Sequence, residues 1–368
     1  MRIVLAPDSF KGTASAEDAA AALAAGWRSV DPTVDVVVRA MADGGEGTID
    51  ALAAAPGAAR HATEVSGPDG RPVTAAWVTL PEGGLTTAVI ELAQSSGITL
   101  MDPLAALDAH TLGLGQVVLA ALEDGAQRLL IAVGGSASTD GGTGALRALG
   151  AQFSDVEGAP LPLGARGLES VARVSLDGLV PLPTGGVTVL TDVTNPLTGP
   201  SGAAAVYGPQ KGASPEDVPR MDAALARLAH VVTSQVPDRA PDPTAPGAGA
   251  AGGTAYGLAL WGATLAHGAS AVADAIDLDG ALAGADLVIT GEGRYDGQSG
   301  QGKVVSEVAR RAGAAGVPVA LVAGAIDAPT DGFAGAVSLT DLAGSGEAAM
   351  ASTLEWLRAA GSQLAHRP

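Results

Sequence analysis

Short apolar runs rich in β-branched residues recur along the chain, and each is followed by a polar loop and a segment with helical periodicity. The first example is a run at residues 2–6, a loop, and an alanine-rich segment at 15–30, where Ser15 and Asp18 resemble a helix capping box. Such runs lie near residues 4, 36, 288, 320 and 337, at the two ends of the chain. Parallel strands joined by helices produce this order, so we predict one doubly wound parallel sheet built from both ends.

The middle of the chain follows a different pattern. Residues 61–92 hold three short β-rich segments separated by Gly and Pro, which predict an antiparallel meander. Helices and strands are expected after this meander, at 110–124, 128–133, 187–193 and 214–236. The sequence from 238 to 253 is rich in Pro, Gly and Ala and ends in AAGG, which favours a linker or a mobile loop.

These patterns predict an α/β protein with two domains. We expect residues 1–60 and 281–368 to form the doubly wound α/β domain, and residues 61–280 to form an inserted mixed α/β domain. With 368 residues and 47% hydrophobic content, the chain is long enough to bury two cores. Because ligands often bind between domains, we expect the functional site in the cleft between these two.

The charge balance limits the partners of the protein. Twenty basic residues stand against thirty-nine acidic ones, which gives a formal net charge of -19. This charge repels a phosphate backbone and argues against a nucleic-acid partner. An anionic ligand must therefore meet local positive groups. The chain has no cysteine, so it can have neither a disulfide framework nor thiolate chemistry.

The N-terminal sequence MRIVLAPDSFKG has only a short apolar run before Pro7 and Asp8. It is typical of neither a signal peptide nor a membrane-spanning helix. Elsewhere no window reaches the ~18 unbroken apolar residues that a membrane helix needs. We therefore expect a cytoplasmic protein with no membrane partner. The sequence leaves open whether it forms a homo-oligomer.

Polar loops follow three of the strands that the sequence predicts. In open parallel sheets, ligands collect beyond the carboxyl ends of the strands, where such loops lie. The three loops supply Asp8, Ser9 and Lys11; Asp43 and Glu46; and Glu292, Arg294, Asp296 and Lys303. Phosphoryl transfer needs cations for phosphate, carboxylates for Mg²⁺ and a carboxylate near the accepting hydroxyl. These loops contain all three kinds of group.

Two loops of the predicted insert also carry polar side chains. GGSASTDGGTG at 134–144 could wrap a phosphate with its backbone amides, although it matches neither the Walker pattern nor GxGxxG. TDVTNPLTGP at 191–200 places Asp192 and Asn195 at a strand end, and GPQKG adds Lys211. These residue types in these positions indicate an anion-binding or phosphoryl-transfer site.

Structural interpretations of the same residues remain open at this point. A single acid in a glycine loop is often a turn device. Asp43 and Glu46 could be first-turn acids that favour a helix dipole, and Asp140 and Asp192 could be helix N-caps. Two other functions also remain open. One is a Mg²⁺-dependent phosphatase with Asp8 as nucleophile, and the other is a non-enzymatic anion-binding protein.

Five long motifs resemble those of the glycerate kinases of bacterial glyoxylate and sugar-acid pathways, both in sequence and in their order along the chain. They are APDSFKG, MADGGEGT, GGSASTDGGTG, TDVTNPLTGPSGAAAVYGPQKGA and DLVITGEGRYDGQS. The resemblance runs from residue 1 to beyond 320. It implies an ATP-dependent phosphotransferase that phosphorylates D-glycerate at the 2-hydroxyl with Mg²⁺ as cofactor. It also implies one flavodoxin-like domain and one mixed α/β domain.

The family motifs place the matching residues in the cleft without assigning their roles, so we assign roles from side-chain chemistry. Asp192, as general base or Mg²⁺ ligand, and Lys11 are expected to be catalytic. The binding residues are expected to be Asp8, Ser9, Asn195 and Arg294 for substrate and phosphate, Gly134, Gly135, Ser136, Asp140 and Gly141 for the nucleotide, and Asp43, Glu46, Glu292 and Asp296 for the metal. The sequence leaves open 2- versus 3-phosphoglycerate as product, and whether other small hydroxy acids are accepted.

Overall fold

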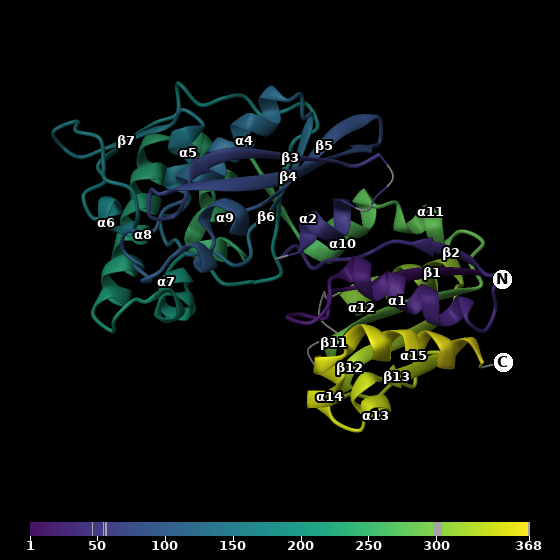
Figure 1. Ribbon diagram of the computed structural model, residues 1–368. Coiled ribbons are helices and arrows are strands. Elements are labelled where there is room, and N and C mark those ends of the chain that lie inside the picture. Colours follow the sequence, from purple (N-terminus) through teal and green to yellow (C-terminus); the bar gives the residue numbers. More distant parts are fainter. Residues whose placement is uncertain (46, 54, 56, 297–303, 367–368) are drawn as a thin grey trace. The chain divides into compact units, whose positions relative to one another are not determined.

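The computed structural model describes residues 1–45, 47–53, 55, 57–296 and 304–366 (Figure 1). Contacts within the chain divide it into two compact units. Unit 1 consists of Met1–Asp43, Gly47–Ala58 and His267–Pro368, and unit 2 consists of Gly44–Glu46 and Ala59–Ala266. Residues 267–280, which the sequence analysis assigned to the insert, belong to unit 1 in this division.

Unit 1 is built on a five-stranded parallel sheet in the order β13-β12-β11-β1-β2. Its strands are β1 (Arg2–Pro7), β2 (Asp35–Val38), β11 (Leu287–Tyr295), β12 (Val319–Ile326) and β13 (Gly335–Ser338). Numbered along the chain within this sheet, the order is 2-1-3-4-5, which is the flavodoxin-like order. The predicted doubly wound sheet is confirmed, and β1 lies beside β11 with Ile3 opposite Leu287.

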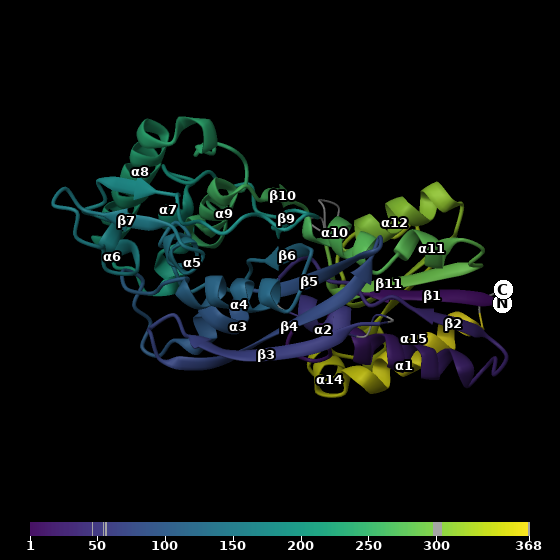
Figure 2. The same cartoon turned by 90° about the horizontal axis from the view of Figure 1, so that it is seen from above.

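Helices cover both faces of this sheet (Figure 2). One face carries α1 (Ala16–Arg28) and α15 (Thr353–Ala365), which pack on each other, and the other carries α10 (Gly268–Ala275), α11 (Leu278–Leu282) and α12 (Val304–Ala315). The unit also contains α2 (Thr48–Ala53), α13 (Leu339–Ala343) and α14 (Gly346–Ala351). Helix α1 begins as expected, because the Ser15 hydroxyl oxygen accepts the backbone N–H of Asp18 at 3.0 Å.

Unit 2 contains a mixed six-stranded sheet in the order β10-β9-β6-β5-β4-β3. The first three strands along the chain form the predicted antiparallel meander, and the remaining neighbours pair in parallel. The strands of this sheet are β3 (Ala59–Ser66), β4 (Pro72–Glu82), β5 (Leu85–Glu91), β6 (Arg128–Ala132), β9 (Val187–Leu190) and β10 (Thr264–Ala266). β7 (Gln152–Ser154) and β8 (Arg173–Ser175) form a separate two-stranded antiparallel sheet.

The helices of unit 2 surround a large apolar core that includes Trp261, Ile90 and Leu129. They are α3 (Ala93–Ser96), α4 (Leu112–Glu123), α5 (Thr143–Ala148), α6 (Ala165–Leu168), α7 (Ala203–Tyr207), α8 (Asp217–Gln235) and α9 (Ala250–Trp261), with short 3-10 turns at Ile98–Leu100, Pro209–Lys211 and Pro237–Arg239. In the part of the chain that the structure describes, no helix combines the length and the apolar character needed to cross a membrane.

Two expectations from the sequence are wrong in detail. Residues 250–253 are not a linker or a mobile loop, because Ala250, Gly252 and Gly253 are buried and the segment opens helix α9. Ala251, Gly252 and Gly253 have positive φ angles of 51°, 66° and 84°. In unit 1, strand β11 continues through GEGRY, which the sequence analysis treated as loop, because Arg294 pairs in register with Ala325 of β12.

Candidate active site

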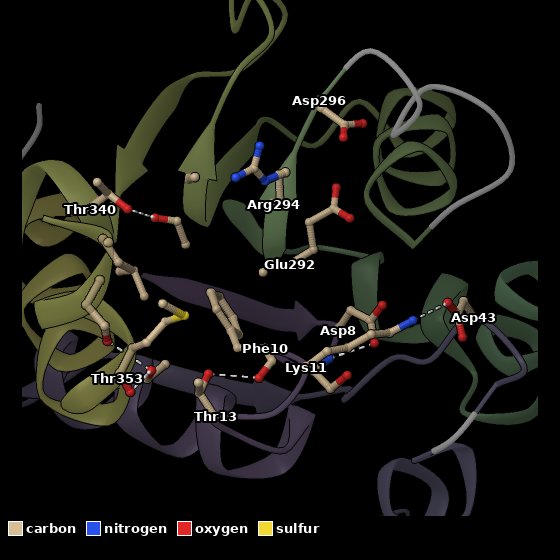
Figure 3. Close-up of a pocket in the computed structure, with 18 residues that line it drawn as sticks. Asp8, Phe10, Lys11, Thr13, Asp43, Glu292, Arg294, Asp296, Thr340 and Thr353 are labelled. Carbon is tan, nitrogen blue, oxygen red and sulfur yellow. Dashed lines mark hydrogen bonds and ion pairs between the residues drawn. The ribbon is translucent and has the colours of Figure 1, made fainter. Parts of the chain in front are cut away.

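A cavity of about 470 Å³ opens in unit 1 at the carboxyl ends of β1, β11 and β12 (Figure 3). Strand order reverses between β1 and β11, which is the position where open α/β sheets bind ligands. The sequence-predicted residues that line it are Asp8, Ser9, Lys11, Asp43, Glu292, Arg294 and Asp296. Segments distant in the sequence therefore bring both acids and cations to one cavity.

Asp8 is an acid of this cavity with a strongly raised pKa. Asp8 follows β1 directly and is 9% exposed. Its carboxylate accepts a hydrogen bond from the backbone N–H of Ser9 at 2.6 Å. Burial raises the pKa of Asp8 to about 7, and the negative charges of Asp43 and Glu292 act in the same direction. A carboxyl group with this pKa exchanges protons near neutral pH, which suits a general acid or base.

Lys11 and Asp43 form an ion pair on the same side of the cavity. The Lys11 ammonium donates to Asp43 Oδ2 at 3.1 Å, and the Asp43 side chain is only 25% exposed. Burial lowers the pKa of Lys11, but the charges of Asp43, Asp8 and Glu292 outweigh it, so the net shift is upward. Lys11 is therefore a permanent cation among carboxylates.

The upper side of the cavity in Figure 3 carries Glu292, Arg294 and Asp296. Arg294 donates to Asp327 at 2.8 Å, and both side chains are more than half exposed. An exposed pair of this kind is weak and can exchange for another anion. Among the described residues, no group of three acidic, His or Cys side chains is arranged to hold a metal ion. Glu46, predicted as a metal ligand, lies outside the described residues, as does Lys303.

The loop at 134–144 lies in unit 2 and is mostly buried. Asp140 is fully buried, and its carboxylate accepts four hydrogen bonds, from the N–H and hydroxyl of Thr111 and from the N–H groups of Gly142 and Gly144, at 2.8 to 3.1 Å. The N–H of Gly141 donates to Gly252 O at 3.0 Å. These contacts make Asp140 and Gly141 internal supports of the loop.

The other predicted residues of this loop differ in exposure. Gly135 is exposed, Gly134 is half-buried, and Ser136 is buried, where its hydroxyl accepts a hydrogen bond from Lys211. The nucleotide prediction for residues 134–144 stays a prediction. Within this loop, Gly134 and Gly135 are the predicted nucleotide residues with exposed surface.

Lys211 has a structural role that its sequence motif does not indicate. It is 2% exposed, and its ammonium donates to Ser136 Oγ at 2.7 Å and to the carbonyl oxygen of Ser138 at 2.5 Å. Burial lowers its pKa to about 7, although Asp140 acts in the opposite direction. Lys211 thus braces the 134–144 loop from inside. The motif GPQKG gives no sign of this, because lysine side chains are usually exposed.

The loop after β9 carries the remaining candidates. Asp192 is half-buried, and Asn195 braces its own loop: its Nδ2 donates to the carbonyl of Ser201 at 2.8 Å and its Oδ1 accepts from the Tyr207 hydroxyl at 2.7 Å. Asn195 thus already has an internal partner on each side of its amide. The assignments of Asp192 and Asn195 stay predictions.

Comparisons with known proteins agree with one another. The model of the glycerate kinase family matches residues 3–367. Glycerate 2-kinase of Escherichia coli strain K12 is 42% identical over 334 residues, covering 89% of this chain and 86% of that protein. Glycerate kinase of Bacillus subtilis strain 168 is 41% identical over 330 residues, with 89% and 85% covered. A crystal structure from Salmonella typhimurium LT2, assigned to glycerate kinase 2, has a TM-score of 0.87 at 38% identity and covers 99% of this chain and 97% of that one.

Proposed function

This chain belongs to the glycerate kinase family, and from that premise we propose that it transfers the γ-phosphoryl group of ATP to the 2-hydroxyl of D-glycerate. The observation that carries the proposal is the buried carboxyl group of Asp8, at the switch point of the unit 1 sheet and beside the cation Lys11. Phosphoryl transfer requires these two kinds of group: one to take the hydroxyl proton and one to neutralise phosphate.

We assign the proton-accepting role to Asp8. A pKa of about 7 keeps a substantial fraction of Asp8 ionised at neutral pH and still leaves it basic enough to accept a proton from an alcohol as the oxygen attacks phosphorus. Lys11 and Arg294 are the cations that would meet the phosphates or the glycerate carboxylate. The predicted role of Asp192 at the reacting centre is the competing assignment, and the two are separated by experiment below.

The cavity acids suit a magnesium ion that takes one or two protein carboxylates, since no three acidic side chains of the described residues converge on one point. Asp43, Glu292 and Asp296 offer carboxylate oxygens, the ligand type that Mg²⁺ takes. Burial is the main cause of the raised pKa of Asp8, and a cation here would relieve the repulsion from Asp43 and Glu292 that adds to it. Mg²⁺ commonly binds through one or two carboxylates together with phosphate oxygens and water. Bound here, it would neutralise charge on the phosphates while Asp43 and Glu292 hold it.

The direct test is incubation of the full chain with ATP, Mg²⁺ and D-glycerate, followed by 31P NMR. We expect ADP and 2-phosphoglycerate to appear in equal amounts. A signal of 3-phosphoglycerate would correct the position of transfer. Release of inorganic phosphate from phosphoglycerate, with ATP untouched, would instead support the phosphatase alternative. A parallel series with related hydroxy acids defines the substrate range.

Replacing Lys11 by Met is expected to lower kcat/KM roughly 10- to 100-fold, because one charge-assisted hydrogen bond to an anionic substrate is lost. The methionine keeps the apolar stem of the side chain. Arg28→Met is the matched control, since Arg28 is an exposed cation at the end of α1 that does not line the cavity. Steady-state kinetics for both substrates measure the effect. Equal kcat/KM values for the two variants would show that Lys11 does not bind either substrate.

A further inference from the structure

The unit 1 cavity has a second end that the phosphoryl-transfer chemistry does not use. Figure 3 shows the Phe10 ring between two groups of side chains, with Asp8, Lys11 and Asp43 on one side and Thr340 and Thr353 on the other. The second group comes from α13, α14 and α15, and the apolar side chains that line the cavity there are the buried Leu339 and Ala349 and the exposed Met350. We call this region the apolar end.

The size of the cavity exceeds the need of a three-carbon acid. Cavities of roughly 300–1,000 Å³ hold ligands of drug size, and this one measures about 470 Å³. A ligand that fills it must carry an anionic or metal-bound part for the charged end and an apolar part for the other. A nucleoside triphosphate has these two parts in one molecule.

The polar groups of the apolar end are engaged within the protein. The Thr340 hydroxyl donates to the carbonyl oxygen of Gly324 at 2.7 Å, and the Thr353 hydroxyl donates to that of Ala349 at 3.0 Å. Both hydroxyl hydrogens are therefore committed, and the hydroxyl oxygens remain as acceptors. Met350 is 63% exposed although it is a large apolar side chain. A thioether at such an edge packs well against an aromatic ring.

We propose that the apolar end binds the adenine base of the nucleotide, with its phosphates directed toward Lys11. The inference rests on the proposed kinase function and deepens it, since it assigns the base to unit 1 rather than to the 134–144 loop. Adenine is flat and apolar on its faces, and its amino group can donate to a threonine oxygen. In the 134–144 loop, by contrast, the N–H groups of Gly141, Gly142 and Gly144 already have acceptors inside unit 2.

Gly346 provides a way to close the apolar end without moving the fold. It is the first residue of α14 and lines the cavity, and a Cβ added there would meet only Thr340 Oγ1, at 3.9 Å. A phenylalanine at this position would therefore occupy the Thr340 side of the cavity. Gly313 of α12 is the matched control, because a Cβ there meets nothing within 4 Å and the residue is exposed outside the cavity.

Calorimetric titration with ADP and with inorganic tripolyphosphate, both with Mg²⁺, separates base binding from phosphate binding. For Gly346→Phe we expect the Kd of ADP to rise at least tenfold and the Kd of tripolyphosphate to stay within twofold of wild type. Gly313→Phe should leave both unchanged. An unchanged Kd of ADP in Gly346→Phe would overturn the proposal. No turnover is measured, so the result is independent of whether glycerate is the acceptor.

If Gly346→Phe binds neither ADP nor tripolyphosphate, photolabelling of the wild-type protein with 8-azido-ATP locates the base instead. The azide sits on the base, so covalent attachment reports where the base lies. Label on peptides that contain residues 324–353 supports the proposal. Label confined to a peptide that contains residues 134–144 overturns it. If that occurs while ADP and phosphoglycerate still form, the proposed function stands and only the placement of the base is wrong.

Discussion

Replacing Asp8 by Asn is expected to lower kcat about a thousandfold, because a well-placed general base contributes on the order of 10²–10⁴ in rate. The amide keeps the size and the polarity of the side chain and removes its capacity to accept a proton. Steady-state kinetics at pH 8 with saturating ATP and D-glycerate measure the change. Asp192→Asn, made in parallel, tests the competing assignment of the base.

The pH dependence of kcat/KM of the wild-type enzyme should also reflect Asp8 acting as the general base. Since Asp8 must be ionised to accept a proton and its pKa in the folded, metal-free protein is about 7, kcat/KM should rise with pH up to about 7, and bound Mg²⁺ should move this rise to lower pH. The variant that loses the base also loses this inflection. If Asp8→Asn keeps kcat within about threefold of wild type, less than ~1 kcal/mol of transition-state stabilisation is lost and Asp8 is not the base. The assignment would then pass to Asp192 if its variant shows the larger loss.

The Asp8→Asn variant should also be more stable than wild type at alkaline pH. The pKa of Asp8 is raised on folding, from 3.8 to about 7, so the folded state holds the proton more tightly. The contribution of Asp8 to stability is therefore greatest below pH 3.8 and is lost as the pH rises through 7. At pH 8 the loss amounts to at most about 4 kcal/mol, and asparagine avoids it. In urea unfolding, the free energy of unfolding of Asp8→Asn should exceed that of wild type at pH 8, and this difference should be smaller at pH 4.

Replacing Gly252 by Ala is expected to destabilise unit 2 by about 3 kcal/mol or more. The φ angle of 66° is unfavourable for alanine, and the added Cβ would overlap the carbonyl oxygen of Ser138. That carbonyl cannot move freely, because Lys211 binds it and Asp140 fixes the rest of the loop. Thermal unfolding should shift by roughly 6–12 °C, at 2–4 °C for each kcal/mol in a domain of this size.

The control for this substitution is Gly186→Ala. Gly186 also has a positive φ, of 78°, but a Cβ at that position meets nothing within 4 Å. Alanine at this position has only the backbone cost of a positive φ, which is about 1–2 kcal/mol. Equal shifts in melting temperature for the two variants would mean that residues 250–253 do not press on the 134–144 loop in solution.

The sequence predicted the framework of unit 1 well, and the reason is local. Apolar runs such as those at 2–6 and 317–324 form buried strands whatever their distant partners are, because no other arrangement hides their side chains from water. Polar residues directly after such runs must lie at the carboxyl edge of the sheet. This is how Asp8, Lys11 and Asp43 could be assigned to one site.

Features that depend on distant partners could not be predicted in this way. The raised pKa of Asp8 requires burial beside Asp43 and Glu292, which are far from it in the sequence. The AAGG segment reads as a linker, since glycine-rich composition serves both flexible loops and close backbone packing, and only the contact with Ser138 decides between them. The apolar end of the cavity comes from C-terminal helices whose sequence carries no motif.

The pairing of β1 with β11, which we call the seam, affects the order in which parts of the protein can fold during synthesis. Unit 2 is nearly continuous in sequence, whereas β1 must wait for a partner whose Leu287 lies opposite Ile3. During synthesis the insert can thus collapse on the ribosome while the first strand, helix and second strand emerge without a complete sheet. The cavity lies at this seam, so we expect binding competence to arise last, after the C-terminal strands have left the exit tunnel.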